Sequence, residues 1–398
     1  MTIAAVLAAL VAATAITIAG TNGGRAVDDR LRVNARSHAS VSVTWPKRRG
    51  ATRYRVYRDG RLIGETARTT FTDLMLWPAT GYRYRVEAWS RSRRVGTARS
   101  SGRVRTRALP QSGFPSPFGP AGIWNRPLAE NPPIHPNSEG LMANWAGRYL
   151  RNPNMTLRAY GVPVAEVRRS DPRYSVPCTK YECTLGAFGP FRIPVTAKAD
   201  PGEDGHLSVH DPAAKREWGM WQASYDVDAG RWSASAGAAV SLAGNGIARG
   251  GKASGNAANF PLLGGLIRPE EILYGRIKHP LVFGQPGIGP GRPVCPATAN
   301  VATTRDPLAL REGTLLQLDP AVDVAALDLP PWQRTVARAL QEYGMYLRDN
   351  AGTLTVYAEN PVARGYDAWA RVGLRGESTG FWSAFPWRRM RVIAAGNC

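Results

Sequence analysis

Short runs in which apolar and polar residues alternate, each bounded by turn residues, fill the segment 29–106. A period of two places successive side chains on opposite faces, which is the geometry of a β-strand and not of a helix. Asp59-Gly60 separates two of these runs and is a typical hairpin turn. Repeated at regular spacing, such strands predict a β-sandwich. The strand-like runs are residues 41–45, 54–58, 62–66, 70–73 and 82–89.

A set of aromatic, apolar and turn residues recurs through this segment, namely Trp45, the run 54–60, Leu76, Pro78, Thr80, Tyr82, Tyr84 and Val86. On these residues the segment resembles a fibronectin type III domain. The resemblance implies that Tyr82 is the tyrosine corner, whose hydroxyl ties a loop to the next strand. Alternation directs Tyr84 and Val86 to the core and Arg83 and Arg85 outward. In bacteria such modules are typically accessory units of secreted enzymes that degrade polysaccharides, so the resemblance implies a companion activity of that kind.

The rest of the chain divides into a linker and a larger domain. Four prolines between residues 107 and 122 predict an extended linker. Turns are frequent, with 42 Gly and 31 Pro in 398 residues, which favours a mainly β architecture. We expect residues 123–398 to form one β-rich domain, sandwich-like or jelly-roll-like, with two helices. Capping residues and apolar spacing predict these helices over 137–150 and 332–347.

The first residues and the cysteines both indicate an exported protein. Residues 3–19 are apolar and uncharged, so we interpret 1–26 as an export signal or a membrane anchor. An even number of cysteines in an exported chain favours disulfides, and we expect the pairs Cys178–Cys183 and Cys295–Cys398. Neither the second pair nor nearby histidines have zinc-ligand spacing, so no metal is expected. The predicted location is secreted or extracellular, with anchoring by the N-terminal segment left open.

Positive charge is concentrated near the N-terminus. The chain holds 51 Lys and Arg against 30 Asp and Glu, a formal charge of +21. Residues 1–110 hold 21 of these bases and 6 of the acids. No nucleic-acid motif accompanies the charge, so nucleic acid is not an expected partner. The first domain faces an anionic surface or polymer, or its charges are simply solvated.

The hairpin 217–241 has the composition of a sugar-binding surface. In its first strand Trp218, Gln222, Ser224 and Asp226 share one face by alternation, while Trp221 lies on the other. A sugar ring stacks its C–H face on tryptophan and hydrogen-bonds through its edge. The alternative is an ordinary sandwich whose polar side faces water.

Five further residues are candidates for chemistry or substrate binding. His210-Asp211 is a possible proton-transfer element, although a structural, hydrogen-bonded histidine is the alternative. Glu271 lies at a predicted helix start, where a carboxylate also has a purely structural role. Arg268 and His279 are placed to flank a groove.

Residues 205–350 also resemble a group of exported, actinobacterial-type proteins. The runs that carry this resemblance are 218–223, 261–272 and 343–349. It implies export and the extent of the domain, and no particular reaction.

These features together predict a secreted carbohydrate-active protein. If it is an enzyme, we expect glycoside hydrolysis by two acids drawn from Asp211, Glu217, Asp226 and Glu271, with His210 assisting. Trp218, Gln222, Ser224, Arg268 and His279 would hold the polysaccharide. The alternative is a non-catalytic protein that binds a glycan or the cell envelope, and a lyase acting on uronate polymers is a third possibility. No dinucleotide, phosphate-loop or metalloprotease motif is present, so no cofactor is expected.

Overall fold

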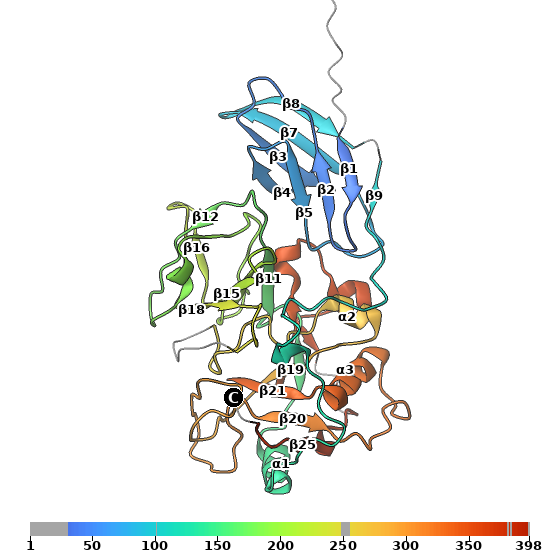
Figure 1. Cartoon of the computed structure of the whole chain (residues 1–398), viewed down its shortest axis with the longest axis vertical. Coiled ribbons are helices and arrows are strands. Elements are labelled where there is room, and N and C mark those ends of the chain that lie inside the picture. The colour runs from blue at the N-terminus through green and yellow to red at the C-terminus, as the bar shows by residue number, and fades with distance from the viewer. Residues whose placement is uncertain (1–30, 101, 248–254, 380–381, 383, 397–398) are drawn as a thin grey trace, which may run out of the picture.

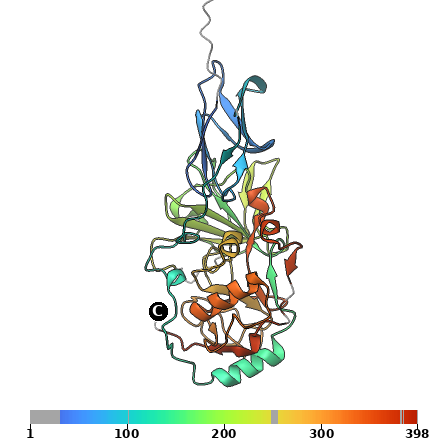
Figure 2. The same ribbon diagram turned by 90° about the vertical axis from the view of Figure 1, so that its right-hand side faces the viewer.

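The computed structural model describes residues 31–100, 102–247, 255–379, 382 and 384–396. The fold is mainly β, as predicted. Figures 1 and 2 show a narrow β-sandwich at one end of the long axis and helix α1 at the other. The predicted export or anchor segment, 1–26, lies outside the described residues. Among the residues that are described, no helix is long and apolar enough to cross a membrane.

Residues 31–106, called the sandwich below, form two facing sheets. The first has the order β1-β2-β5, and the second has the order β4-β3-β7-β8. A short pair, β6 and β9, closes one edge. The strands are β1 (Arg32–Ala35), β2 (Val41–Thr44), β3 (Arg53–Arg58), β4 (Arg61–Thr66), β5 (Thr70–Asp73), β6 (Gly81–Tyr82), β7 (Tyr84–Ser90), β8 (Arg93–Arg99) and β9 (Val104–Arg105).

The core of the sandwich confirms the predicted alternation. Tyr82, Tyr84 and Val86 are buried, as predicted. The backbone N–H of Trp77 donates to the hydroxyl oxygen of Tyr82 over 2.8 Å, which is the contact of a tyrosine corner. This one hydrogen bond fixes the loop before β6 to the strand that follows it.

The region that follows the linker, called the larger region below, contains two larger sheets of mixed direction. A five-stranded sheet has the order β18-β15-β14-β11-β23, and a seven-stranded sheet has the order β24-β10-β22-β19-β21-β20-β25. Each sheet combines parallel and antiparallel neighbours, because β11 runs parallel to β14 and β23, and β19 runs parallel to β21.

The strands of the larger region, including two short pairs outside these sheets, are mostly brief. They are β10 (Asn154–Thr156), β11 (Val162–Glu166), β12 (Arg173–Tyr174), β13 (Phe191–Arg192), β14 (Leu207–Asp211), β15 (Arg216–Trp221), β16 (Ser224–Asp226), β17 (Arg231–Ser233), β18 (Ala236–Ser241), β19 (Leu281–Gln285), β20 (Leu315–Leu318), β21 (Met345–Asn350), β22 (Thr355–Tyr357), β23 (Glu359–Asn360), β24 (Ser378–Thr379) and β25 (Met390–Val392).

Both predicted helices are present. They are α1 (Ser138–Arg148) and α3 (Pro331–Glu342), and a short third helix, α2 (Pro269–Tyr274), lies between them. The prediction of α3 through residue 347 was wrong. Gly344 adopts a positive φ of 74°, which turns the chain out of the helix and into β21.

The hairpin 217–241 is present, but its first strand is interrupted. Residues 216–221 pair with 236–241 as β15 and β18, and residues 224–226 pair with 231–233 as β16 and β17. Gln222 between them adopts a positive φ of 50°. Alternation therefore does not continue through this point, and the predicted common face of Trp218, Gln222 and Ser224 is wrong.

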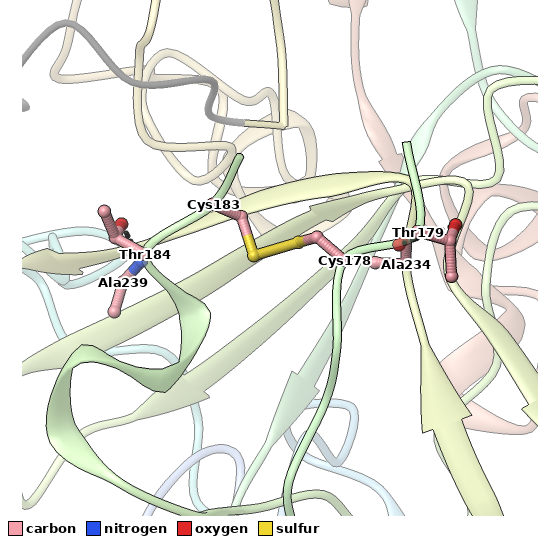
Figure 3. The surroundings of a disulfide bond; sticks show 6 residues. All are labelled: Cys178, Thr179, Cys183, Thr184, Ala234 and Ala239. Carbon is pink, nitrogen blue, oxygen red and sulfur yellow. Dashed lines mark hydrogen bonds between the residues drawn. A yellow bond between two sulfur atoms is a disulfide. The ribbon is translucent and has the colours of Figure 1, made fainter. Parts of the chain in front are cut away.

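A disulfide fastens the loop beside this hairpin. The predicted bond between Cys178 and Cys183 is present, and Figure 3 shows it lying over the strands of the hairpin. Cys295 is also disulfide-bonded, while Cys398 lies outside the described residues.

Candidate functional site

A cleft of about 790 Å³ lies where the sandwich meets the larger region, and we call it the arginine cleft. Its described lining residues come from the end of β5, the segment after β11, the β12–β13 pair and the turn after β14. They are Thr72, Leu74, Val167, Arg168, Arg169, Arg173, Arg192, Asp211, Pro212, Ala213 and Ala214. Segments far apart in sequence thus form a single basic wall.

The short β12–β13 pair holds two of the arginines side by side. Arg173 lies directly opposite Arg192 in this antiparallel pair, so both side chains are on the same face. On the other face, Phe191 is buried and stacks on Trp218 at a ring distance of 4.7 Å. That stacking leaves the arginine face toward the cleft. Like charges directly opposite each other destabilise a sheet, and a bound anion would relieve this cost.

Arg168 joins the two regions. Its Nε donates to the carbonyl oxygen of Thr72 over 2.6 Å. Its terminal nitrogens lie 3.7 Å from Asp73 and 3.8 Å from Asp171, and its guanidinium covers the ring of Phe71. Arg168 is therefore largely engaged within the protein, whereas the neighbouring Arg169 is exposed.

The lining of the cleft contains one carboxylate among its described residues, and that carboxylate is hydrogen-bonded within its own turn. Asp211 is the one carboxylate among the described lining residues. It accepts the backbone N–H groups of Ala213 and Ala214, each over 3.0 Å, and so stabilises its own turn. The Nε of Arg192 is buried and has no hydrogen-bond partner among the described residues. The lining therefore holds four arginines and one carboxylate, while Asp73 and Asp171 lie beside Arg168 and Asp171 also interacts with Arg192.

A buried ion pair stabilises the same junction from the sandwich side. Both carboxylate oxygens of Asp73 accept from Arg58 over 3.1 Å, and the hydroxyl of Tyr84 donates to Asp73 over 2.8 Å. Arg58 also donates to the carbonyl oxygen of Arg364 over 3.0 Å. Because Asp73 is buried between Arg58 and Arg168, one carboxylate links both regions.

A second set of buried charges lies within the larger region. Arg364 donates to Glu270 over 3.0 Å and to Glu359 over 2.7 Å, and Arg268 also pairs with Glu359. Burial alone would raise the pKa of Glu359, but Arg268 and Arg364 outweigh it and hold that pKa below its ordinary value. Arg268, predicted to bind substrate, is therefore buried in an internal ion pair.

Glu217 and His210, two predicted catalytic residues, lie opposite each other on β15 and β14 and are buried. Glu217 is 0% exposed, and its Oε1 accepts from the Ser208 hydroxyl over 2.6 Å and from the backbone N–H of Leu263 over 2.9 Å. Burial raises the pKa of Glu217 to about 7. The Nδ1 of His210 lies 3.5 Å from a carboxylate oxygen of Glu166.

The other predicted acids have separate local partners. Asp226 is exposed and accepts the backbone N–H of Ala229 over 2.9 Å. Glu271 is buried, accepts the backbone N–H of Arg268 over 2.9 Å and lies 3.0 Å from Nε2 of His279. Among the described residues, each of the four predicted acids therefore bonds to partners of its own and not to another of the four.

The predicted sugar-binding residues are not brought together. Trp218 was expected on an open polar face, but it is buried under Phe191, and this expectation is corrected. Gln222 and Ser224 are exposed, and Nε2 of Gln222 donates to the carbonyl oxygen of Glu203 over 3.4 Å. Burial would lower the pKa of His279, but Glu271 outweighs it, so the pKa of His279 is raised.

Sequence reasoning missed the arginines that line the cleft. The doublet Arg168-Arg169 and the nearby Arg173 were a visible local signal, but Arg192 joins them only through the β12–β13 pairing. Across the described residues, no group of three or more His, Cys, Asp or Glu side chains could hold a metal ion.

Comparison with known proteins informs one part of the chain. No family model matches, and no curated protein matches. Among solved structures, the protein titled FN3tt is 18% identical over 19% of this chain and 88% of its own length, with a TM-score of 0.18. The sixth fibronectin type III domain of the human fibronectin type III domain containing protein 3 is 27% identical. The match covers 24% of this chain and 99% of that domain, with a TM-score of 0.18.

A Yersinia enterocolitica family 28 exopolygalacturonase is 19% identical over 21% of this chain and 20% of that enzyme, with a TM-score of 0.19. The structural neighbours are thus fibronectin type III domains over about 20% of the chain. The comparisons do not support the resemblance of residues 205–350 to exported actinobacterial-type proteins.

Proposed function

We propose that this protein is an exported, non-catalytic binder of acidic polysaccharides, and that the arginine cleft is its binding site. One observation carries the proposal: four arginines surround a cleft of about 790 Å³, and the single lining carboxylate among the described residues is bonded within its own turn. The volume lies within the range of ligand-binding clefts in proteins.

Guanidinium groups suit the carboxylates of a uronate polymer. Arginine presents a planar set of donors that can bond both oxygens of a carboxylate at once. Arg173 and Arg192 are neighbours on one face, so they can engage carboxylates of adjacent sugar residues or share one. Binding would also relieve the repulsion between them.

The junction gives this site a rigid frame. Thr72 and Leu74 of the sandwich form one wall, and Arg168 bonds across to Thr72. A preformed site loses less conformational entropy when it binds. The sandwich therefore contributes to the binding site itself, beyond the accessory role that its fibronectin type III likeness implies.

Hydrolysis stays a prediction, because the four predicted acids do not form a pair among the described residues. Glycosidases need two carboxyl groups about 5–10 Å apart across the scissile bond. Glu217 and Glu271 are buried, while Asp211 and Asp226 accept backbone N–H groups in turns. A lyase would need a histidine or tyrosine base at the arginines, and neither type is among the described lining residues. Binding without cleavage is the function that these positions favour.

The test is retention of the full chain in native gels that contain polygalacturonate, compared with gels that contain no polysaccharide. We expect retention by polygalacturonate that weakens steeply as salt rises, because the attraction between charges is screened. The variant Arg169→Gln/Arg173→Gln should lose affinity by about tenfold or more, since each removes a charge-assisted contact.

The matched control is Arg338→Gln, an exposed arginine on α3 outside the cleft, which should leave retention unchanged. Equal retention of the double variant and the unmodified protein would overturn the proposed site. Release of reducing ends or unsaturated products from polygalacturonate would overturn the non-catalytic assignment.

A further inference from the structure

Two aromatic side chains form an exposed pair beside the disulfide loop. The rings of Tyr181 and Trp221 are tilted by 34° with centroids 6.1 Å apart. Tyr181 is 51% exposed and Trp221 is half-buried. The ammonium of Lys180 lies 5.4 Å from both ring centroids. Large aromatic surface left in contact with water at a rigid position is typical of a binding site.

The loop that carries Tyr181 is held in place on both sides. The Cys178–Cys183 disulfide closes it, and the backbone N–H groups of Thr179 and Tyr181 donate to the hairpin over 2.8 and 3.0 Å. Figure 3 shows the Thr179 contact with Ala234 next to the disulfide. The pair is therefore preorganised and does not need to order its backbone on binding.

A hydrogen bond from the indole N–H fixes the orientation of the Trp221 side chain. Its indole Nε1 donates to a carboxylate oxygen of Asp204 over 3.2 Å. This contact occupies the indole N–H, so a ligand can meet only the ring surface that Lys180 does not cover. Gln222, the next residue, is exposed and donates to the carbonyl oxygen of Glu203, so polar groups border the rings.

The charge around this pair differs from that of the arginine cleft. Both signs of charge are present: Lys180 lies over the Trp221 ring, Asp204 accepts from the Trp221 indole, and the exposed Glu182 follows Tyr181 in the chain. An acidic sugar therefore gains no net attraction here. A flat aromatic pair with a mixed polar border suits the C–H face of an uncharged sugar ring, whose hydroxyl groups can then reach the border.

The pair is also distant from the arginine cleft. Arg216, the first residue of β15, lies opposite the cleft residue Asp211, whereas Trp221 is the last residue of the same strand. Five residues of extended strand separate the two ends by about 16 Å. The two places can thus bind different sugars independently.

We propose that Tyr181 and Trp221 form a second carbohydrate site, a stacking platform for a ring of a neutral polysaccharide. This site goes beyond the acidic-glycan function and does not depend on it. Its affinity comes from stacking and hydroxyl contacts, so it should change little with salt, unlike binding in the arginine cleft.

The experiment is native gel retention of the full chain by three neutral glucans, namely dextran, laminarin and hydroxyethylcellulose, at low and high salt. We expect at least one of them to retain the protein with little salt dependence. Trp221→Ala and Tyr181→Ala should each weaken retention by about fivefold or more, because each removes one stacking face. The control Phe188→Ala removes an equally exposed ring, 52% exposed, that lies against Arg216 at the other end of β15, and it should behave as the unmodified protein.

Tyr181→Ala changes an exposed side chain, so the protein should still fold. It therefore tests the platform even if Trp221→Ala disturbs packing. Removing the disulfide with Cys178→Ser/Cys183→Ser should also weaken retention, since the loop then loses its closure. Failure of all three glucans to retain the unmodified protein, or retention unaffected by both aromatic variants, would overturn the platform. Arg169→Gln/Arg173→Gln should keep full retention by the neutral glucan. The proposal for the platform and the proposal for the arginine cleft are therefore tested independently.

Discussion

The surface of the sandwich and the buried network of the larger region use arginine in opposite ways. In the sandwich, Arg55 pairs with Glu65 at a partly exposed position and its guanidinium covers the ring of Trp89 at 4.6 Å. In the larger region, Arg364 is almost completely buried between two carboxylates. Exposed pairs contribute little stability, whereas breaking a buried pair leaves an uncompensated charge. The same residue type therefore has a small energetic effect at the exposed surface and a large one in the buried network.

This contrast changes how the high net charge is interpreted. Several basic residues of the sandwich are already paired, including Arg85 and Arg94 with Glu87 and Arg103 with Asp59. The proposed ligand-binding arginines lie at the junction instead, where few acids line the cleft. Local position, more than total charge, decides which arginines can meet a ligand.

The largest expected effect is in the buried network. Arg364→Met leaves the carboxylates of Glu270 and Glu359 buried without their principal partner. We expect the free energy of unfolding to fall by about 3–5 kcal/mol in urea denaturation at pH 7. Arg389→Met, which breaks the exposed pair with Asp319, is the control and should cost about 0–1 kcal/mol. Equal losses for the two variants would contradict the contrast between buried and exposed arginine pairs.

The next effect concerns pH. The pKa of Glu217 is raised from its ordinary 4.5 to about 7, so the folded state favours the protonated form. A raised pKa gives stability that is complete below pH 4.5 and is lost as pH rises toward 7 and above. Compared with Glu217→Gln, the unmodified protein should therefore lose about 3 kcal/mol of unfolding free energy across this range.

The measurement for Glu217 is urea denaturation at several pH values between 4 and 8. Asp226→Asn is the control, since it removes an exposed acid. A stability difference between Glu217→Gln and the unmodified protein that does not vary with pH would contradict the raised pKa.

A smaller loss is expected where the two regions meet. Asp73→Asn removes the carboxylate that Arg58 and Arg168 share, and should cost about 1–3 kcal/mol. Calorimetry should then show the sandwich unfolding at a lower temperature than the larger region. Asp59→Asn changes an exposed acid of the sandwich and should leave the transition in place. A single, unshifted transition for Asp73→Asn would show that this carboxylate does not couple the regions.

The smallest effect is on the surface of the sandwich. Glu65→Gln breaks the pairs with Arg53 and Arg55, both partly exposed, and should cost about 0.2–1 kcal/mol. The difference should vanish in high salt, because solvent-exposed charges are screened. A loss comparable to that of Arg364→Met would remove the distinction between the two kinds of arginine.

The sandwich could be predicted in detail because its signals are local. Strand alternation repeats every two residues, and Tyr82 reaches back only to Trp77. The Cys178–Cys183 bond was predictable for the same reason, since five positions separate its ends. Short-range patterns of this kind leave few alternative structures.

The site could not be predicted in the same way, because its parts meet only through the tertiary fold. Thr72, Arg168 and Arg192 line one cleft although up to 120 positions separate them, and Arg364 reaches Glu270 across 94. An irregular backbone conformation also made the faces of the hairpin 217–241 unpredictable from alternation. The positive φ of Gln222, a conformation unusual for any residue but glycine, ends the alternation of β15, so the polar residues that follow it do not share the face of the buried Trp218.

The position of Asp73 limits how freely the N-terminal module could be exchanged. Here the neighbour depends on one acid at the end of β5 and on the backbone of Thr72 beside it. A different module placed at this position would need a carboxylate at the same strand end. Without it, Arg168 would lose the contact that holds the sandwich against the larger region at the arginine cleft.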